Sequence, residues 1–169
     1  MRKRGHRIRH SARDATAFVR LIANRSTLPD GHLMNVGLAY HMALEALRLG
    51  RATDTDMNHL SLALNMAMAL CELGHGADQL PRVHEAQDAL VRCEPYSRKV
   101  GHWVVNGDTY KLLCNVLGLH DQQLAAATQK EIREACAYVS RQREAGNVIR
   151  LEETAEHDRD AGTERGCAV

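Results

Sequence analysis

Two short stretches of this sequence carry residue types that could hold a metal ion. Glu72 and His75 have the spacing by which one helical turn presents a carboxylate and an imidazole to a metal. A ferritin-like di-iron site needs two such pairs and two further glutamates, and only one pair exists here. His84 and Glu85 begin a stretch similar to the zinc-binding HExxH motif, but Asp88 stands where the second histidine belongs. We therefore predict no metal site, and a metal-binding helical bundle is the weakest of three functional hypotheses.

The common catalytic motifs are missing from the chain. The sequence contains no glycine-rich dinucleotide or phosphate loop, no serine nucleophile elbow and no complete HExxH. Each of these motifs places a reactive or phosphate-binding group in a defined turn or helix, so their absence removes the usual routes to enzymatic chemistry. We predict a non-enzymatic protein with no catalytic residues and no cofactor.

One internal segment interleaves cations with aromatic residues. Such a mixture suits single-stranded nucleic acid, through phosphate pairing and base stacking, and it equally suits a protein-binding hot spot. A structural alternative is that the single tryptophan plugs the open end of a helical bundle. The predicted partner-binding residues of this segment are Tyr96, Arg98, Lys99, His102, Trp103 and Lys111.

The amino-terminal stretch is the most basic part of the chain. Residues 1–25 hold eight Lys or Arg and one acidic residue, a charge of about +7, which leaves the remainder near −6. Cations on a short flexible arm neutralise phosphates by counterion release, and no recognition helix is evident, so the predicted binding is sequence-independent. A solubilising tail and a targeting peptide are the alternatives. The predicted phosphate-binding residues are Arg2, Lys3, Arg4, Arg7, Arg9 and Arg13.

Helical periodicity dominates the rest of the chain, and aromatic residues are scarce at 4% of the sequence. The core must then come mainly from Leu, Ala, Met and Val, as in helix-on-helix packing. We predict an all-α protein, a compact helical bundle of five or six helices. It comprises a basic flexible arm over residues 1–10, a helical domain over 11–145 and a disordered polar tail over 146–169.

The central helix is predicted over the stretch 56–74, opened by a capping pair of Thr53 and Asp56. Apolar residues surround most of its circumference, which indicates burial by several neighbours. Its thin polar stripe, which includes Asn58, Ser61 and Asn65, is expected on its least buried face. Leu64 and Leu70 are expected to be nearly fully buried.

Turn and cap signals predict the other helices. One helix is expected to end near residue 24 and a second to cover 31–49. The helix that follows the central helix begins at a cap on Asp78 and ends at Pro95, and an irregular segment follows it to residue 107. The next helix is capped by Asp108, in preference to a β-hairpin closed at 106–107. Residues 108–143 form either one long helix or two helices, of which the second is capped by Asp121. Gly146 ends the helical domain.

Five well-separated cysteines include no closely spaced pair, which argues against a disulfide framework or a zinc ribbon. We interpret Cys71, Cys93, Cys114 and Cys136 as small core residues, and Cys167 as a reactive thiol on the tail. No apolar run approaches 18 residues, so no membrane partner is expected. A reduced, cytoplasmic location is the default expectation.

Two functional hypotheses from different classes remain. The first is an accessory or regulatory protein that associates with nucleic acid through the arm, with the domain available for self-association. The second is a helical adaptor or inhibitor that binds another protein through the segment from Tyr96 to Lys111 and needs no nucleic acid.

Overall fold

The computed structural model describes residues 20–146, and they form an all-α bundle as predicted. Residues 20–25 are helical, and the only β-type pairing in the described part is an isolated antiparallel bridge between Thr27 and Thr128. The arm and the tail lie outside the described residues. The further elements are α2 (Asp30–Arg48), α3 (Asp54–Glu72), the short 3-10 helix η1 (Ala77–Gln79), α4 (Leu80–Val100), α5 (Gly107–Ala126) and α6 (Gln129–Glu144).

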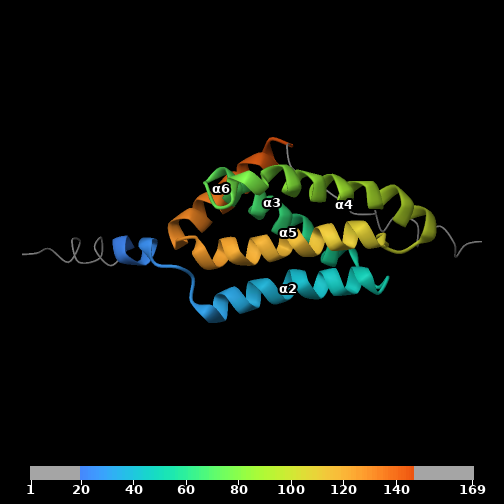
Figure 1. Ribbon diagram of the computed structural model, residues 1–169, viewed down its shortest axis with the longest axis horizontal. Helices are drawn as coiled ribbons and strands as arrows, with labels where there is room; N and C mark the ends of the chain where they lie inside the picture. Colours follow the sequence, from blue (N-terminus) through green and yellow to red (C-terminus); the bar gives the residue numbers. More distant parts are fainter. Residues whose placement is uncertain (1–19, 147–169) are drawn as a thin grey trace, which may run out of the picture.

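Helix α3 is the central helix of the bundle, as predicted. It packs against α2, α4, α5 and α6, and in Figure 1 it lies behind α5, between α2 below and α4 above. Leu64 is 1% exposed and Leu70 is fully buried. A helix that is apolar around its circumference needs neighbours on several sides, and four helices supply them.

Two polar residues expected on the surface of α3 are instead buried, so the prediction for Ser61 and Asn65 is wrong. A polar side chain can be buried when a neighbour satisfies its hydrogen bonds. Gln87 of α4 does this for Asn65, because its Nε2 donates to Asn65 Oδ1 over 2.9 Å. Ser61, one turn earlier on the same stripe, is also buried, and no described residue forms a hydrogen bond with its Oγ. Asn58 is exposed as expected. The apolar Leu62 is also exposed, although the pattern counted it among the apolar residues around the helix.

Side-chain caps begin three of the helices. Thr53 and Asp56 form the predicted capping box of α3. Asn106, and not Asp108, caps α5 by accepting a hydrogen bond from the backbone N–H of Thr109. The α4 N-cap position is Gln79, which makes no side-chain cap bond, so the prediction that Asp78 caps this helix is wrong.

The predicted long helix over 108–143 is two helices, and they do not divide at Asp121. Helix α5 ends at Ala126 because Ala127 has extended backbone. Thr128 and Glu131 then form a second capping box that starts α6, with the Thr128 N–H donating to the Glu131 carboxylate over 2.8 Å. The apolar spacing runs through this break without a change of phase, which is why periodicity alone did not locate it.

Helix α4 continues past Pro95 to Val100, so the prediction that it stops at Pro95 is wrong. A proline inside a helix removes one N–H donor and leaves the carbonyl four residues earlier, here that of Val91, without its helical partner. Both residues are exposed, so water can bind that carbonyl. Tyr96, predicted to be in an irregular segment, therefore lies on a helix, and Gly101 ends α4 with a φ of 76°.

The four described cysteines are free thiols at different depths. Cys71 is buried in the core, whereas Cys93 and Cys114 are half-buried. Cys136 is exposed on α6, so its interpretation as a core residue is wrong. It lies next to the buried Ala135, and one position along a helix rotates a side chain by about 100° from the apolar face.

Two leucines of α3 offer a matched test of this architecture. Leu64→Ala should lower the free energy of unfolding by about 2–5 kcal/mol, through lost burial and the cavity left behind. Leu62→Ala, at a position 54% exposed on the same helix, should change it by less than about 0.5 kcal/mol. Urea denaturation of both variants checks this, and equal effects would contradict the placement of α3.

Candidate functional site

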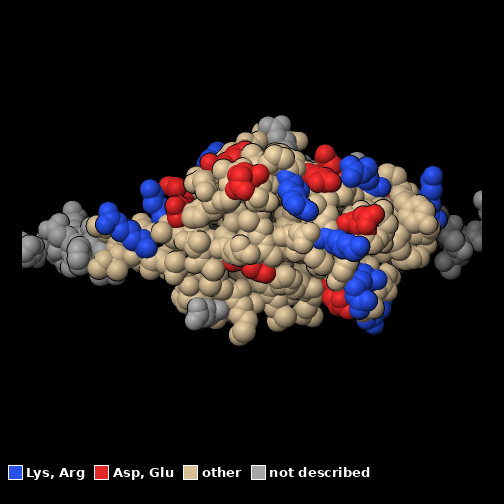
Figure 2. Space-filling view, viewed as in Figure 1, with Lys and Arg blue, Asp and Glu red and all other residues tan. Residues whose placement is uncertain are grey.

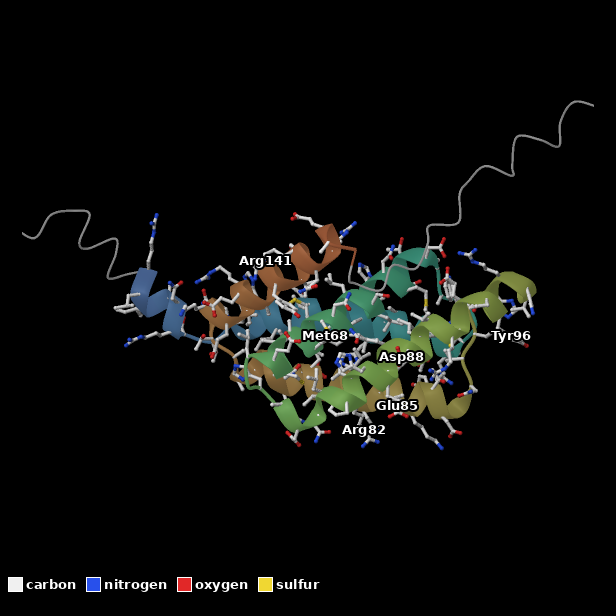
Figure 3. All side chains as sticks on the ribbon, turned by 90° about the horizontal axis from the view of Figure 1, so that it is seen from above. Met68, Arg82, Glu85, Asp88, Tyr96 and Arg141 are labelled. Carbon is white, nitrogen blue, oxygen red and sulfur yellow. The ribbon has the colours of Figure 1, made fainter. Side chains whose placement is uncertain are left out.

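The predicted partner-binding residues gather at one end of the bundle. Tyr96, Arg98 and Lys99 belong to the last turns of α4, as Figure 3 shows for Tyr96. His102 and Trp103 follow in the connection to α5, and Lys111 lies in the second turn of α5. The end of α4 and the connection to α5 therefore lie together, but the end of α4 is helical, whereas the whole segment was expected to be irregular.

Trp103 closes this end of the bundle. Its half-buried ring packs against the main hydrophobic core, and its indole N–H donates to Asp54 Oδ1 at the start of α3 over 2.9 Å. This placement agrees with the interpretation of Trp103 as a plug. A buried tryptophan whose N–H is satisfied holds the connection between α4 and α5 in place.

Acidic residues one turn away accompany two of the predicted cations. An Arg98 guanidinium nitrogen lies 2.6 Å from Glu94 Oε1. Lys111 Nζ lies 3.9 Å from Asp108 Oδ1. These pairs are exposed or partly exposed, so they add little stability, but they reduce the net positive field that a phosphate would meet.

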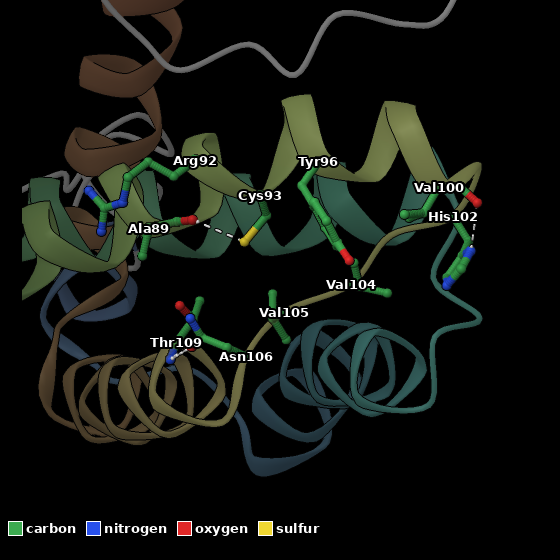
Figure 4. Close-up of a pocket in the computed structure, with 10 residues that line it drawn as sticks. All are labelled: Ala89, Arg92, Cys93, Tyr96, Val100, His102, Val104, Val105, Asn106 and Thr109. Atoms are coloured by element: carbon green, nitrogen blue, oxygen red, sulfur yellow. Dashed lines mark hydrogen bonds between the residues drawn. The ribbon is translucent and has the colours of Figure 1, made fainter.

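Two hollows flank the connection. One, about 670 Å³ in volume, has Arg98, His102 and Trp103 on one wall and residues 50–54 on the other. The second, about 600 Å³, lies between α4 and the start of α5, and Figure 4 shows Cys93 and Tyr96 pointing into it. Lys99 and Lys111 line neither of these two hollows.

The Cys93 thiol in the second hollow is a poor nucleophile. Burial raises its pKa, and its Sγ donates to the Ala89 carbonyl over 3.1 Å. A protonated, hydrogen-bonded thiol lacks the thiolate that catalysis or metal binding requires. The wall opposite carries Asn106 and Thr109, and the Oδ1 of Asn106 caps α5 by accepting a hydrogen bond from the backbone N–H of Thr109. This hollow therefore has room for a ligand, but its cysteine is not an activated nucleophile.

The surface that sequence reasoning missed lies on α2. Its buried side, with Tyr40, Ala43, Leu44 and Leu47, packs on the bundle. Its outer side is also apolar: Met34 is 70% exposed, Leu38 56%, Met42 62% and Leu49 42%. We call these last four residues the α2 face. The available signal was the small number of polar positions in residues 31–49, since apolar residues outnumber Asn35, His41, Glu45 and Arg48 and must occupy both sides of the helix.

Charge is missing from most of this surface. Between residues 31 and 42, none of the exposed residues of α2 is Lys, Arg, Asp or Glu. The outer side of α4 differs, since Arg82, Glu85 and Asp88 are exposed along it (Figure 3). Figure 2 shows a broad, largely uncharged area over α2, with acidic atoms at its border with α5 and the other charged atoms mainly toward the ends and the upper rim.

A polar cluster joins α2 to α5 beside the α2 face. The Tyr40 hydroxyl donates to Asp121 Oδ1, and His41 Nε2 lies 2.9 Å from Asp121 Oδ2. Burial raises the pKa of Tyr40 the most, and the hydrogen bond to Asp121 raises it further. The phenol therefore stays protonated and acts as a fixed donor. A mainly apolar groove of about 450 Å³ opens here, lined by the three residues of the cluster and by residues that include Leu124 and Ala125.

His120 continues this polar system into the core. It is 2% exposed, and its Nδ1 lies 3.4 Å from Gln123 Oε1. Gln123 Nε2 in turn donates to the backbone carbonyls of Ala67 and His75, over 3.1 and 2.8 Å. Burial lowers the pKa of His120 to about 4, although Gln123 and Asp121 act in the opposite direction. The imidazole is therefore neutral near pH 7.

The metal-type residues of the sequence do not assemble into a site in the described part of the chain. His75 Nε2 approaches Glu131 Oε2 at 3.4 Å, but Glu72 is exposed and is not a third member. Among residues 20–146, no three His, Cys, Asp or Glu side chains form a group that could hold a metal ion. None of the described helices is both long and apolar enough to cross a bilayer.

Comparison with known proteins found no matching family model, no similar curated protein and no similar solved structure.

Burial of neutral His120 predicts a specific pH dependence. Its folded pKa is depressed, so as pH falls below about 6.5 the unfolded state binds a proton that the folded state does not. Stability should fall with pH in this range. Between about pH 7.5 and pH 5, the wild-type protein should lose roughly 2 kcal/mol more than His120→Gln, which cannot titrate. Urea titrations at each pH measure this difference.

The control for this measurement is His59→Gln, at an exposed position of α3. It should lose as much stability as the wild type over the same pH range. If His120→Gln also follows the wild-type curve, His120 is not a buried neutral base.

Proposed function

We propose that this chain is a non-enzymatic helical protein-interaction module and that the α2 face is its binding surface. The observation that carries the proposal is a largely apolar outer side, uncharged between residues 31 and 42, on a helix whose inner side is already packed. Helices of soluble monomers usually present polar residues to water. Apolar patches rimmed by polar residues mark contact sites for other molecules.

The energetics support this assignment. Complete burial of a Leu or Met side chain stabilises by about 1.5–3 kcal/mol, and three residues of the α2 face leave more than half of their side-chain surface in water. A partner that covers Met34, Leu38 and Met42 therefore gains several kcal/mol before it pays any cost of ordering. Methionine side chains adapt to different partner shapes, which suits a binding surface.

The predicted basic-aromatic site adjoins the same surface and remains part of the proposal. The α2 face ends at Leu49, next to Gly50, and Gly50 lines the same hollow as Arg98, His102 and Trp103. A partner lying along α2 would meet this end of the bundle. We propose that these residues form the polar rim of the interface, where charged and hydrogen-bonding groups give orientation more than affinity.

Photo-crosslinking in the native cells tests the module. The photoreactive residue p-benzoylphenylalanine replaces Leu38 in the full chain, and the cells are irradiated. A discrete crosslinked species should form, because a side chain buried in an interface lies within reach of the partner. The mass of the adduct, read by gel and mass spectrometry, reports the partner.

The matched control places the same residue at Val91, an exposed apolar position of α4. Figure 1 shows α4 on the opposite side of the bundle from α2. Crosslinking at Leu38 that does not exceed crosslinking at Val91 would remove the α2 face as a binding surface.

Nucleic-acid association is the second candidate, favoured by the charge of the amino terminus. The six cations Arg2, Lys3, Arg4, Arg7, Arg9 and Arg13 precede the described residues, which hold 13 Lys or Arg and 14 Asp or Glu. The bundle therefore adds no positive field of its own, and phosphate contacts would have to come from residues 1–13. In this case the chain is an accessory or regulatory nucleic-acid-associated protein of the cytoplasm.

Salt dependence tests this second candidate. With about five phosphate contacts, binding to duplex DNA should show a log–log salt slope near −4 to −5. Deletion of residues 1–10 should remove most of the slope while the circular dichroism of the bundle is kept. Gel shift at about 50 mM salt with micromolar protein measures it, and no binding of the full chain to DNA or RNA would end this candidate.

A further inference from the structure

The α2 face contains a row with a particular spacing. Met34, Leu38 and Met42 are four residues apart, so they form one ridge along the helix, about 12 Å from the first Cα to the last. All three are more than half exposed. Ridges of four-residue spacing on two helices interdigitate at a crossing angle near −50°, the commonest packing class in globular proteins. This ridge is therefore ready to pack against a second ridge of the same kind.

The ridge is also its own complement. It reads Met, Leu, Met in both chain directions, with Leu38 at its centre. A two-fold axis perpendicular to α2 at Leu38 would place Leu38 against itself and Met34 against Met42 of the other copy. Closed dimers use such an isologous contact, in which one surface patch serves both partners.

The charges near the ridge permit this contact. The exposed residues of α2 from 31 to 42 include no acid, Lys or Arg, so two copies meet there without like-charge repulsion. Glu45 and Arg48 lie beyond the ridge and bind each other, with Arg48 Nε donating to Glu45 Oε2 over 2.8 Å. His41, at the edge, already contacts Asp121. The apolar centre can therefore be covered without burying an unpaired charge.

The apolar surface extends beyond one ridge. A specific dimer buries about 800 Å² on each partner, more than a single crossing of two helices provides. The groove between α2 and α5 begins at Met34 and Leu38 and continues to Leu124 and Ala125. Asp121 also lines it, and its carboxylate is bound by Tyr40 and His41. In Figure 2 the largely uncharged area covers α2 and reaches α5, and acidic atoms lie where the two helices meet. A second copy crossing α2 would lie over this groove.

We infer that the α2 face binds a second copy of this chain, with α2 antiparallel to its counterpart and a two-fold axis at Leu38. The inference rests on the proposed function, since it names the partner of that same surface. In this dimer each Met34 packs beside the Met42 of the other copy, and the groove on α5 receives the flanking side chains.

Cysteine pairing tests the geometry. The full chain carries Cys136→Ser and Cys167→Ser, and single cysteines are added under oxidised glutathione. Leu38→Cys should form a disulfide-linked dimer, because a residue on the axis meets itself. Met34→Cys and Met42→Cys should each link poorly alone, but an equimolar mixture of the two should give the mixed dimer. Val91→Cys on α4 is the control and should not link.

Self-linking of Met34→Cys and of Met42→Cys, each alone, would show parallel helices and overturn the antiparallel arrangement. Linking in none of these variants, or linking no greater than with Val91→Cys, would overturn self-association through this face.

Sedimentation velocity of the native chain gives the independent measurement. The wild type should be dimeric at micromolar concentration, and Leu38→Glu should weaken the dimer by about 100-fold or more, because two carboxylates would enter an apolar contact. Val91→Glu should leave the dimer intact, and circular dichroism confirms that both variants fold.

The two proposals can fail separately. A wild-type chain that is monomeric at every concentration overturns the dimer. If the photo-crosslink at Leu38 then joins the chain to a different protein, the interaction module stands with another partner. If no crosslink forms either, both proposals fail.

Discussion

The burial of α3 is the constraint on which this bundle depends. Its apolar residues occupy nearly its whole circumference, so four other helices must surround it. The covering helices differ in how they meet water. Helix α4 presents charged residues such as Arg82 and Glu85 outward, whereas α2 presents Met34 and Leu38. The bundle thus completes the burial of α3 but leaves α2 half covered, and this is the basis for assigning a binding role to α2.

Buried amides fix how the covering helices sit on α3. Gln87 of α4 binds Asn65, and Gln123 of α5 binds the carbonyls of Ala67 and His75. An amide in an apolar core must find partners of correct geometry, so sliding either helix along α3 would leave it unsatisfied. Packing supplies the stability of the core, and these amides select one register. The register in turn sets Asp121 against Tyr40 and His41, which joins α5 to α2 beside the groove.

Local signals predicted much of the fold. The Thr53 capping box, the central position of α3 and the burial of Leu64 follow from residue type and spacing alone. The sequence-based predictions failed where tertiary contacts determine the structure. Asn65 is buried because Gln87 binds it, and α4 continues through Pro95 because this proline faces water. The α5–α6 break depends on a capping box that lies inside an unbroken apolar pattern. The α2 face was missed because periodicity shows that a helix has two apolar sides without showing which one its own chain covers.

The central claim is that protein covers the α2 face in the working state, and methionine oxidation tests it most directly. In the structure Met34 and Met42 are largely exposed and Met57 is fully buried. Hydrogen peroxide converts accessible methionines to sulfoxides, which peptide mass spectrometry measures site by site. We expect Met34 and Met42 to oxidise rapidly in purified protein diluted until it is monomeric, and slowly inside the native cells, relative to an exposed reference peptide. Met57 should oxidise slowly in both settings. Equally rapid oxidation of Met34 and Met42 in both settings would contradict it.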